Sequence, residues 1–244
     1  MGIQKINDQE RLWRTLDELG DNQSYYLLER FLPGDVYHVD SITVNGEVAF
    51  VSAQKYAAPP MSIYQGGGVF ASRTLDPQGD EVAALRTINE RVIKALGMRN
   101  GITHNEFIRA HADGKYYFLE SAARVGGAFL SDLIAHTTDV DLWEEWARLE
   151  IALMRGEQYR LPAASHRAGA LLMTLAKTIH PDLSAYETPE VVWKADKAYH
   201  AGLIFVSNDY DHVESMLADY LERFKKDFLA VADPWGPQRT GRTE

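Results

Sequence analysis

Alternating hydrophobic and polar residues predict a series of strands separated by single helices. Strand-like runs occupy residues 2–6, 25–31, 36–44, 47–54, 69–75, 168–176, 191–194 and 199–207. Helical stripes, each preceded by a polar capping residue, begin near residues 7, 80, 141 and 211. Because the strands include hairpins and the helices come singly, the pattern predicts an α+β fold with a mainly antiparallel sheet and packed helices.

Two breaks in this pattern predict specific local structures. Asn45 and Gly46 are a two-residue hairpin signal, because both residue types tolerate positive φ. Residues 56–68 lose all periodicity and contain two prolines and three glycines. They predict a flexible loop that either moves over a ligand or has no role of its own.

A third break divides the chain into parts. Residues 161–165 look like a joint between two domains. We therefore expect a first domain over residues 1–162 and a small α+β lobe over residues 163–233. Residues 234–244 are expected to form a polar tail.

Composition and charge narrow the classes of function. Of the 244 residues, 45% are hydrophobic and 25% charged, as in ordinary soluble globular proteins. The net charge of −10 argues against a nucleic-acid-binding surface, which needs a basic face. Cysteine is absent, which excludes disulfides, thiolate catalysis and cysteine-ligated zinc. No apolar run approaches the roughly 20 residues that span a bilayer. No secretion signal opens the chain, so we expect a cytoplasmic protein without a membrane partner.

Residues 101–127 bring the candidate chemistry together in a hairpin of two short strands. Glu106 lies on the first strand and Glu120 on the second. If the turn is residues 113–114, the two carboxylates point to opposite faces of the sheet. If the turn is residues 112–114, with its glycine in the left-handed conformation, Glu106 faces Glu120 directly. We favour the second register.

Two carboxylates that face each other repel, and the repulsion must be offset for the hairpin to hold them. At an effective dielectric constant near 20 they repel by about 4 kcal/mol, so either one is protonated or a cation lies between them. Oxygen ligands suit Mg²⁺, which would be shared with phosphate oxygens. His104 lies on the same face as Glu106. It is either a structural residue or a hydrogen-bond partner of a ligand or glutamate. Arg124 follows Glu120 by four residues and shares its face if the strand continues.

These residues resemble a motif of the ATP-grasp superfamily. The matching residues are His104, Asn105 and Glu106, followed by Glu120, Arg124, Gly126 and Gly127 in the pattern E-x-x-x-R-x-G-G. The likeness is to its carboxylate–amine ligases and carbamoyl-phosphate-synthase-like members. The resemblance implies that the chain binds ATP and Mg²⁺, with Mn²⁺ as an alternative. It implies Glu106 and Glu120 as metal ligands, and Arg124 as a catalytic residue that steadies the phosphoryl group.

The resemblance also implies a nucleotide site before the first hairpin. Residues 27–31 (LLERF) look like the family's hinge segment, whose backbone reads the adenine amino group. The implied nucleotide-binding residues are Glu29, Arg30, Phe31, Leu32, His38 and Asp40. Lys55 and Arg73 lie where basic residues of the family often face phosphate or substrate.

The chain departs from the family pattern in two ways. Ala122 stands where many members carry an asparagine metal ligand. The likeness covers only the C-terminal portion of the family fold, so a leading domain and its glycine-rich lid would belong to a missing N-terminal segment or subunit. The implied function is an ADP-forming ligase that activates a small carboxylate, such as an amino acid, as an acyl phosphate for attack by an amine. The alternative is a truncated or split, non-catalytic module that binds a nucleotide or a partner.

Overall fold

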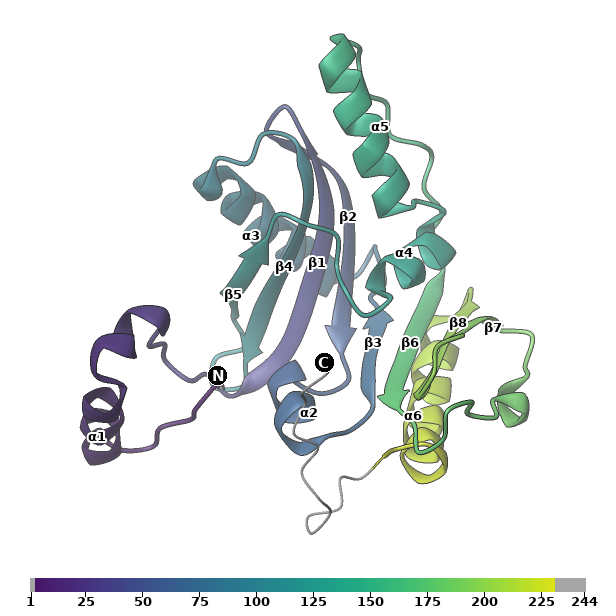
Figure 1. Ribbon diagram of the computed structural model, residues 1–244. Helices are drawn as coiled ribbons and strands as arrows, with labels where there is room; N and C mark the ends of the chain where they lie inside the picture. Colours follow the sequence, from purple (N-terminus) through teal and green to yellow (C-terminus); the bar gives the residue numbers. More distant parts are fainter. Residues whose placement is uncertain (1–2, 231–244) are drawn as a thin grey trace, which may run out of the picture.

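One antiparallel sheet runs through the structure, which describes residues 3–230 and, within them, all side chains except those of residues 64–66. The eight strands of this described part are β1 (Gly34–Val44), β2 (Glu47–Tyr56), β3 (Phe70–Thr74), β4 (Gly101–Ala110), β5 (Tyr116–Ala122), β6 (Ala168–Leu175), β7 (Val191–Lys194) and β8 (His200–Ser207). The computed structural model orders them β5-β4-β1-β2-β3-β6-β8-β7 (Figure 1). Every neighbouring pair is antiparallel, which confirms the predicted fold class.

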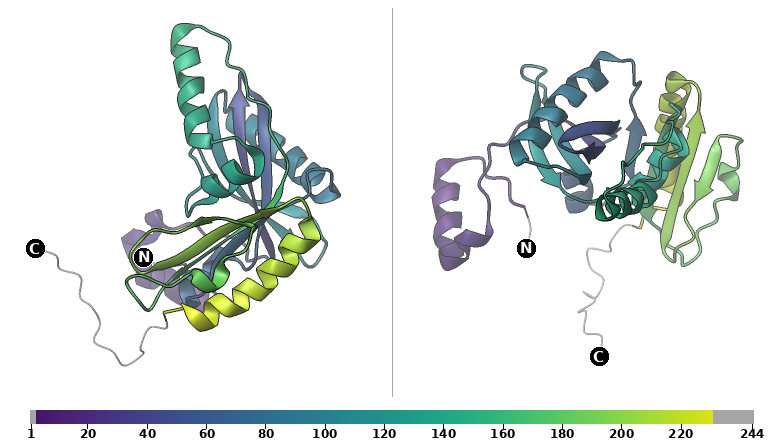
Figure 2. Two further views of the ribbon diagram at one scale, coloured as in Figure 1. Left: turned by 90° about the vertical axis from the view of Figure 1, so that its right-hand side faces the viewer. Right: turned by 90° about the horizontal axis from the view of Figure 1, so that it is seen from above.

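Helices cover both faces of this sheet (Figures 1 and 2). The helices are α1 (Gln9–Leu19), α2 (Pro60–Gly66), α3 (Asp80–Leu96), α4 (Leu130–Thr138), α5 (Leu142–Arg155) and α6 (Tyr210–Asp227), with the 3₁₀ turns η1 (Gly20–Tyr25) and η2 (Ser184–Tyr186). Helix α3 packs beside β1 and β2, and α6 packs beside β6 and β8 on the same face. Helices α4 and α5 lie on the opposite face, against β6 and β4.

Alternation along β1 sends its side chains to two different cores. Val39 packs with the apolar residues of α3, whereas Ile42 packs with those of α5. Successive side chains of a strand point to opposite faces. His38 and Asp40 therefore share the face of Ile42, and this face carries the candidate site.

The hairpin predicted at residues 45–46 is confirmed. Asn45 and Gly46 have φ angles of 54° and 89°, and Val44 pairs with Glu47 across the turn. Positive φ at both central residues is the geometry that matches the twist of the flanking strands. The turn therefore places β2 directly beside β1.

The N-terminal segment differs from its prediction. Residues 3–6 and 26–33 form no strand and are not part of the sheet. Helix α1 begins one residue later than predicted, since Asp8 caps it and accepts from the backbone N–H of Arg11 at 2.8 Å. No residue of α1 is buried, so the helical stripe predicted from about residue 7 covers no core.

Two further local predictions need correction, and one helix was missed. The predicted loop over residues 56–68 contains α2, in which Pro60 takes the first position, where its missing N–H costs no hydrogen bond. Helix α4 was not predicted. Helix α6 is capped by Asp209 rather than Asp211, because the Asp209 side chain accepts from the backbone N–H groups of the first turn.

The predicted boundary between residues 162 and 163 stays a prediction. The sheet itself continues across it, because β3 pairs with β6. Residues 234–244, the predicted tail, lie outside the described residues. Among the described residues, no helix has the length and apolar character to cross a membrane.

Candidate active site

The β4–β5 hairpin places Glu106 directly opposite Glu120, as the sequence predicts. The route to this register differs from the prediction. Ala110 and Lys115 close the turn, which spans residues 111–114. The predicted three-residue turn is therefore wrong.

A β-bulge restores the predicted pairing. Phe107 pairs with Phe118, whereas Glu106 pairs with Glu120, so Leu119 is the extra residue on β5. Without this bulge, the observed turn would place Leu119 opposite Glu106 and turn the Glu120 carboxylate to the other face. The facing of the two carboxylates thus depends on one inserted residue.

Beside this pair lies a buried cluster of two histidines and one aspartate. Asp40 and His38 come from β1, and His104 comes from β4, directly opposite Asp40. His38 Nδ1 lies 2.8 Å from Asp40 Oδ2, and His104 Nδ1 lies 2.9 Å from Asp40 Oδ1. Potential metal-ligand atoms of all three lie within 4.8 Å of one another. Because both histidine contacts are already hydrogen bonds to Asp40, the cluster is satisfied without a metal ion.

The two histidines differ in charge because their surroundings differ. Burial alone would lower the pKa of His104, but the charge and hydrogen bond of Asp40, together with the contact of Glu106, outweigh burial and raise the pKa to about 9. Burial also dominates at His38 and lowers its pKa. Burial alone would raise the pKa of Asp40, but the His104 charge and hydrogen bonds from both histidines hold it below its usual range. The cluster is therefore an Asp40–His104 ion pair beside a neutral His38.

Glu106 connects this cluster to the carboxylate pair. The Tyr56 hydroxyl donates to Glu106 Oε1 at 2.7 Å, and His104 Nε2 lies 3.5 Å from the same oxygen. Burial alone would raise the pKa of Glu106, but these two contacts outweigh it and lower the pKa. Burial, followed by the charge of Glu106, raises the pKa of Tyr56 far above its usual value. Glu106 is therefore an ionised carboxylate held through one oxygen.

The chain of polar contacts continues to β3. The proton of neutral His38 lies on Nδ1, toward Asp40, so Nε2 accepts from the Ser72 hydroxyl at 2.9 Å. The Ser72 oxygen also lies 3.4 Å from Gln54 Oε1. Sequence reasoning missed Tyr56, Ser72 and Gln54. The available signal was polar residues at alternate positions of otherwise apolar strands, which places them on one face.

Gly126 lies against the centre of the cluster. A Cβ atom at Gly126 would lie 2.8 Å from Asp40 Oδ1 and 3.1 Å from His104 Nδ1. By contrast, a Cβ atom at Gly127 would meet nothing within 4 Å. The backbone after β5 therefore approaches the Asp40–His104 pair at a position where only glycine fits.

The predicted catalytic residue and the predicted nucleotide-binding residues 29–32 lie in segments that form no strand. Arg124 follows the end of β5, where strand parity no longer applies, and its Nη1 donates to the Val125 carbonyl oxygen at 2.9 Å. It is exposed and forms no ion pair with any described residue. Residues 29–32 lie in a segment before β1 that forms no strand or helix, with Phe31 under the ammonium group of Lys5 at 3.9 Å. Their roles in catalysis and nucleotide binding stay predictions.

Other predicted site residues already have protein partners. Lys55 pairs with Asp35 at 2.8 Å, and Arg73 pairs with Glu214 at 3.1 Å. His38 and Asp40, predicted near the nucleotide, are fully buried. A direct contact of either with nucleotide stays a prediction.

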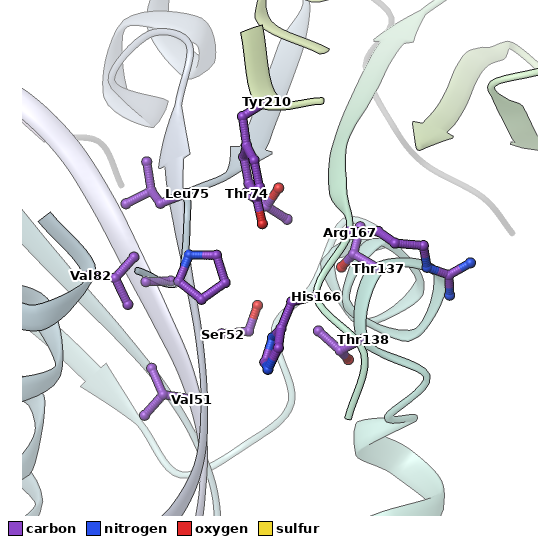
Figure 3. Close-up of a pocket in the computed structure, with 12 residues that line it drawn as sticks. Val51, Ser52, Thr74, Leu75, Val82, Thr137, Thr138, His166, Arg167 and Tyr210 are labelled. Carbon is purple, nitrogen blue, oxygen red and sulfur yellow. The ribbon is translucent and has the colours of Figure 1, made fainter. Parts of the chain in front are cut away.

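A small cavity lies between the sheet, α4 and the start of α6 (Figure 3). Ser52, Thr137, His166 and Tyr210 are among its lining residues, and its volume is about 30 Å³. That volume holds a water molecule but no nucleotide. A wider hollow of about 780 Å³ lies beside β5 and includes Glu120 in its lining. Only the second is of the size that small ligands occupy.

Known proteins resemble the chain in sequence and in structure, although no protein-family model matches it. An L-arginine-specific L-amino acid ligase of Bacillus subtilis is 29% identical over 155 residues, which are 61% of this chain and 36% of that protein. An L-amino acid ligase from Bacillus licheniformis is similar in structure with a TM-score of 0.66 at 14% identity, over 93% of this chain and 62% of that chain. N5-carboxyaminoimidazole ribonucleotide synthetase from Thermus thermophilus has a TM-score of 0.62 at 17% identity, over 95% of this chain and 60% of that chain. The chain therefore spans less than two thirds of each of these proteins.

Proposed function

We propose, on the premise that this chain has the ATP-grasp fold of these ligases, that it forms the ATP- and Mg²⁺-binding portion of an ADP-forming ligase. The ligase would activate a carboxylate as an acyl phosphate, which an amine then attacks. The observation that carries the proposal is Glu106 facing Glu120 on the face of the sheet that also holds the buried cluster. The partial coverage of the relatives fits the predicted likeness to the C-terminal portion of these ligases.

The residues present fit Mg²⁺. Both donors are carboxylates, and they come from neighbouring strands on one face. Both polar contacts of Glu106 within the described structure are made by Oε1, which leaves Oε2 for a ligand. When bound there, the cation would neutralise charge on the phosphate oxygens of ATP. With Mn²⁺ in its place the same oxygen donors would serve.

This chain's own residues would handle the charge on the transferring group. The exposed Arg124 guanidinium has no ion-pair partner among the described residues, so it is available to an anionic phosphoryl group. Residues 29–32 would hold the adenine ring, after their segment closes on it. His38 and Asp40 would support the nucleotide site from beneath the surface. The carboxylate substrate would be a small one such as an amino acid, the class named for the L-amino acid ligases.

One observation favours the alternative of a non-catalytic binding module. Ala122 lies opposite His104 and has no side-chain oxygen to bind a metal where many members of the resembled family have asparagine. With only two carboxylates, the site would bind a nucleotide through one cation and not assemble the full set for phosphoryl transfer. The activating residues would then come from an N-terminal segment or separate subunit.

Calorimetric titration of ATP with Mg²⁺ into the chain tests the binding claim. Glu120→Gln removes a charge with little change of shape, and Glu47→Gln removes one from an exposed position on β2, away from the site. We expect Glu120→Gln to weaken binding about tenfold or more, because a charged contact is worth roughly 1.5–3 kcal/mol. Glu47→Gln should bind like the wild type. Equal affinities for wild type and Glu120→Gln would disprove the cation site.

Release of ADP separates the ligase from the binding module. ATP and Mg²⁺ would be incubated with the chain and a panel of L-amino acids, singly and in pairs. A ligase releases ADP when a carboxylate and an amine are both present, and Arg124→Ala should slow that release. Binding of ATP without ADP release under any of these conditions would support the module instead.

A further inference from the structure

A buried chain of polar contacts crosses four neighbouring strands and ends at Glu106. It runs through Gln54, Ser72, His38, Asp40, His104 and Glu106. Asp40 lies at its centre, is 0% exposed, and uses one carboxylate oxygen for each histidine. A fully buried carboxylate is costly unless it is paired, so its two partners fix its position and it fixes theirs.

His104 lies between two carboxylates. Its Nδ1 is 2.9 Å from Asp40 Oδ1, and its Nε2 is 3.5 Å from Glu106 Oε1. A lone pair on either nitrogen would face a negative oxygen, so both ring nitrogens carry protons in this arrangement. The His104 ring, held by Asp40, therefore orients the Glu106 carboxylate.

Glu106 is thereby held through one oxygen only. Tyr56 donates to the same Oε1 that His104 contacts, whereas Oε2 has no polar partner among the described residues. The Tyr56 hydrogen bond and the His104 ion pair, both at this oxygen, restrict the rotation of the carboxylate group. Oε2 is left at a set position on the strand that faces Glu120.

We propose that Asp40 is a positioning residue for the cation site: through His104 it fixes the Glu106 carboxylate so that Oε2 is presented to a divalent cation beside Glu120. The inference rests on the proposed function, because the cation is the one that function requires. It gives Asp40 an indirect role under the site instead of a contact with nucleotide. Groups that orient a metal ligand from behind influence metal affinity by about 10- to 100-fold.

Mn²⁺ binding in the presence of saturating ATP tests the inference, with free Mn²⁺ measured by electron paramagnetic resonance. Asp40→Asn keeps the shape but removes the charge and one acceptor. We expect it to raise the Mn²⁺ dissociation constant about 10-fold or more. Ser72→Ala is the matched control at the other end of the chain of contacts. It should change the constant less than about threefold, because Ser72 touches His38 and not His104. Equal Mn²⁺ affinity of Asp40→Asn and wild type would overturn the inference.

A second pair of variants serves if Asp40→Asn does not fold. Gly126→Ala keeps every polar group but inserts a methyl group 2.8 Å from Asp40 Oδ1. Gly127→Ala adds the same methyl group where nothing lies within 4 Å. We expect Gly126→Ala to weaken Mn²⁺ binding at least tenfold more than Gly127→Ala does. Indistinguishable constants for the two variants would contradict the positioning role.

A nitrogen-15 NMR spectrum of the His104 ring separates failure of this inference from failure of the proposed function. If the wild type binds no Mn²⁺ with ATP, the proposed function fails for this chain, and the spectrum alone decides the positioning role. We expect two protonated ring nitrogens in the wild type and a changed pattern in Asp40→Asn, with Ser72→Ala like the wild type. An identical His104 pattern in wild type and Asp40→Asn would show that Asp40 does not set the state of His104.

Discussion

The centre of the sheet and the N-terminal segment of residues 3–33 differ in burial: polar side chains are buried and hydrogen-bonded in the first, whereas the second has no buried side chain. At the centre, Asp40 is fully buried and both its oxygens accept hydrogen bonds. In the segment, α1 has no buried residue, and Leu27 is 80% exposed. Figure 1 shows α1 apart from the sheet. The cation side of the proposed site is therefore built into the sheet, whereas the predicted adenine side at residues 29–32 has no packed position of its own.

The physical origin of this difference is backbone pairing. Strands β1 and β4 pair over ten residues, from Gly34 opposite Ala110 to Thr43 opposite Gly101. Such a ladder holds facing side chains about 5 Å apart. Residues 26–33 pair with no strand in the described structure, so nothing comparable fixes their side chains. A ligand that bridges the two regions would have to order the segment, at the cost of its conformational freedom.

The largest effect should come from breaking the buried centre. Asp40→Ala removes the main partner of the buried His104 inside the sheet. We expect a loss of about 3–5 kcal/mol in the free energy of unfolding, as for other buried ion pairs that lose one member. Urea unfolding followed by circular dichroism measures it. A loss below about 1 kcal/mol, the size of an ordinary surface substitution, would mean that the buried cluster stabilises the fold no more than an exposed residue does.

The pH dependence of stability should distinguish the same centre from the segment. The pKa of His104 is raised to about 9 in the folded chain, against roughly 6.5 in an unfolded one. Its contribution to the free energy of unfolding is therefore fully present below about pH 6.5 and is lost as the pH rises through 9. The titratable groups around it are Asp40, His38, Glu106 and Tyr56.

Urea unfolding in EDTA at several pH values checks this dependence. The pKa of Asp40 is lowered in the folded chain. Its contribution to the free energy of unfolding is therefore present at neutral pH and is lost only in acid, below the ordinary pKa of an aspartate. The stability difference between wild type and His104→Gln should therefore be greatest between about pH 4.5 and 6.5 and should shrink toward about pH 9.5. A difference that grows with pH would have the wrong sign for this ion pair.

An intermediate effect is expected at the rim of the cluster. Tyr56→Phe removes the hydroxyl that donates to Glu106 Oε1. We expect a loss of about 1–3 kcal/mol in the free energy of unfolding, because a charge-assisted hydrogen bond disappears and the carboxylate keeps His104. Tyr117→Phe removes a hydroxyl that donates to the exposed Asp113, and is the matched control with a smaller expected loss. Equal losses would remove the distinction between the buried and exposed contacts.

The smallest effect is expected in the N-terminal segment. Leu16→Ala in α1 should change the free energy of unfolding by less than about 1 kcal/mol, because the side chain covers no core. Limited proteolysis should cut within residues 3–33 before it cuts the sheet, as expected where few contacts oppose local opening. Protection of that segment on addition of ATP and Mg²⁺ would show that ligand orders it. First cleavage within β1 or β4 would reverse the comparison.

The sequence predicted the sheet region far better than the segment before it. The turn at residues 45–46 follows from two residues that tolerate positive φ, a strictly local property. The strand prediction for residues 25–31 was wrong because an apolar run records hydrophobicity and not the presence of a pairing partner. The facing of Glu106 and Glu120 was correct although the turn was not, since the bulge at Leu119 compensated for the longer turn.

By itself, the sequence determined the α+β class, the hairpin at residues 45–46 and the spacing of the motif from His104 to Arg124. These depend on residue type, periodicity and short-range turn chemistry. The tertiary structure decided that Asp40 lies opposite His104, that Tyr56 reaches Glu106 and that Gly126 lies against both members of the buried ion pair. Such contacts join residues far apart in the chain, as from Asp40 to Gly126, and depend on the register between strands. One residue of slip in that register reverses which face a side chain occupies, and no local pattern records it.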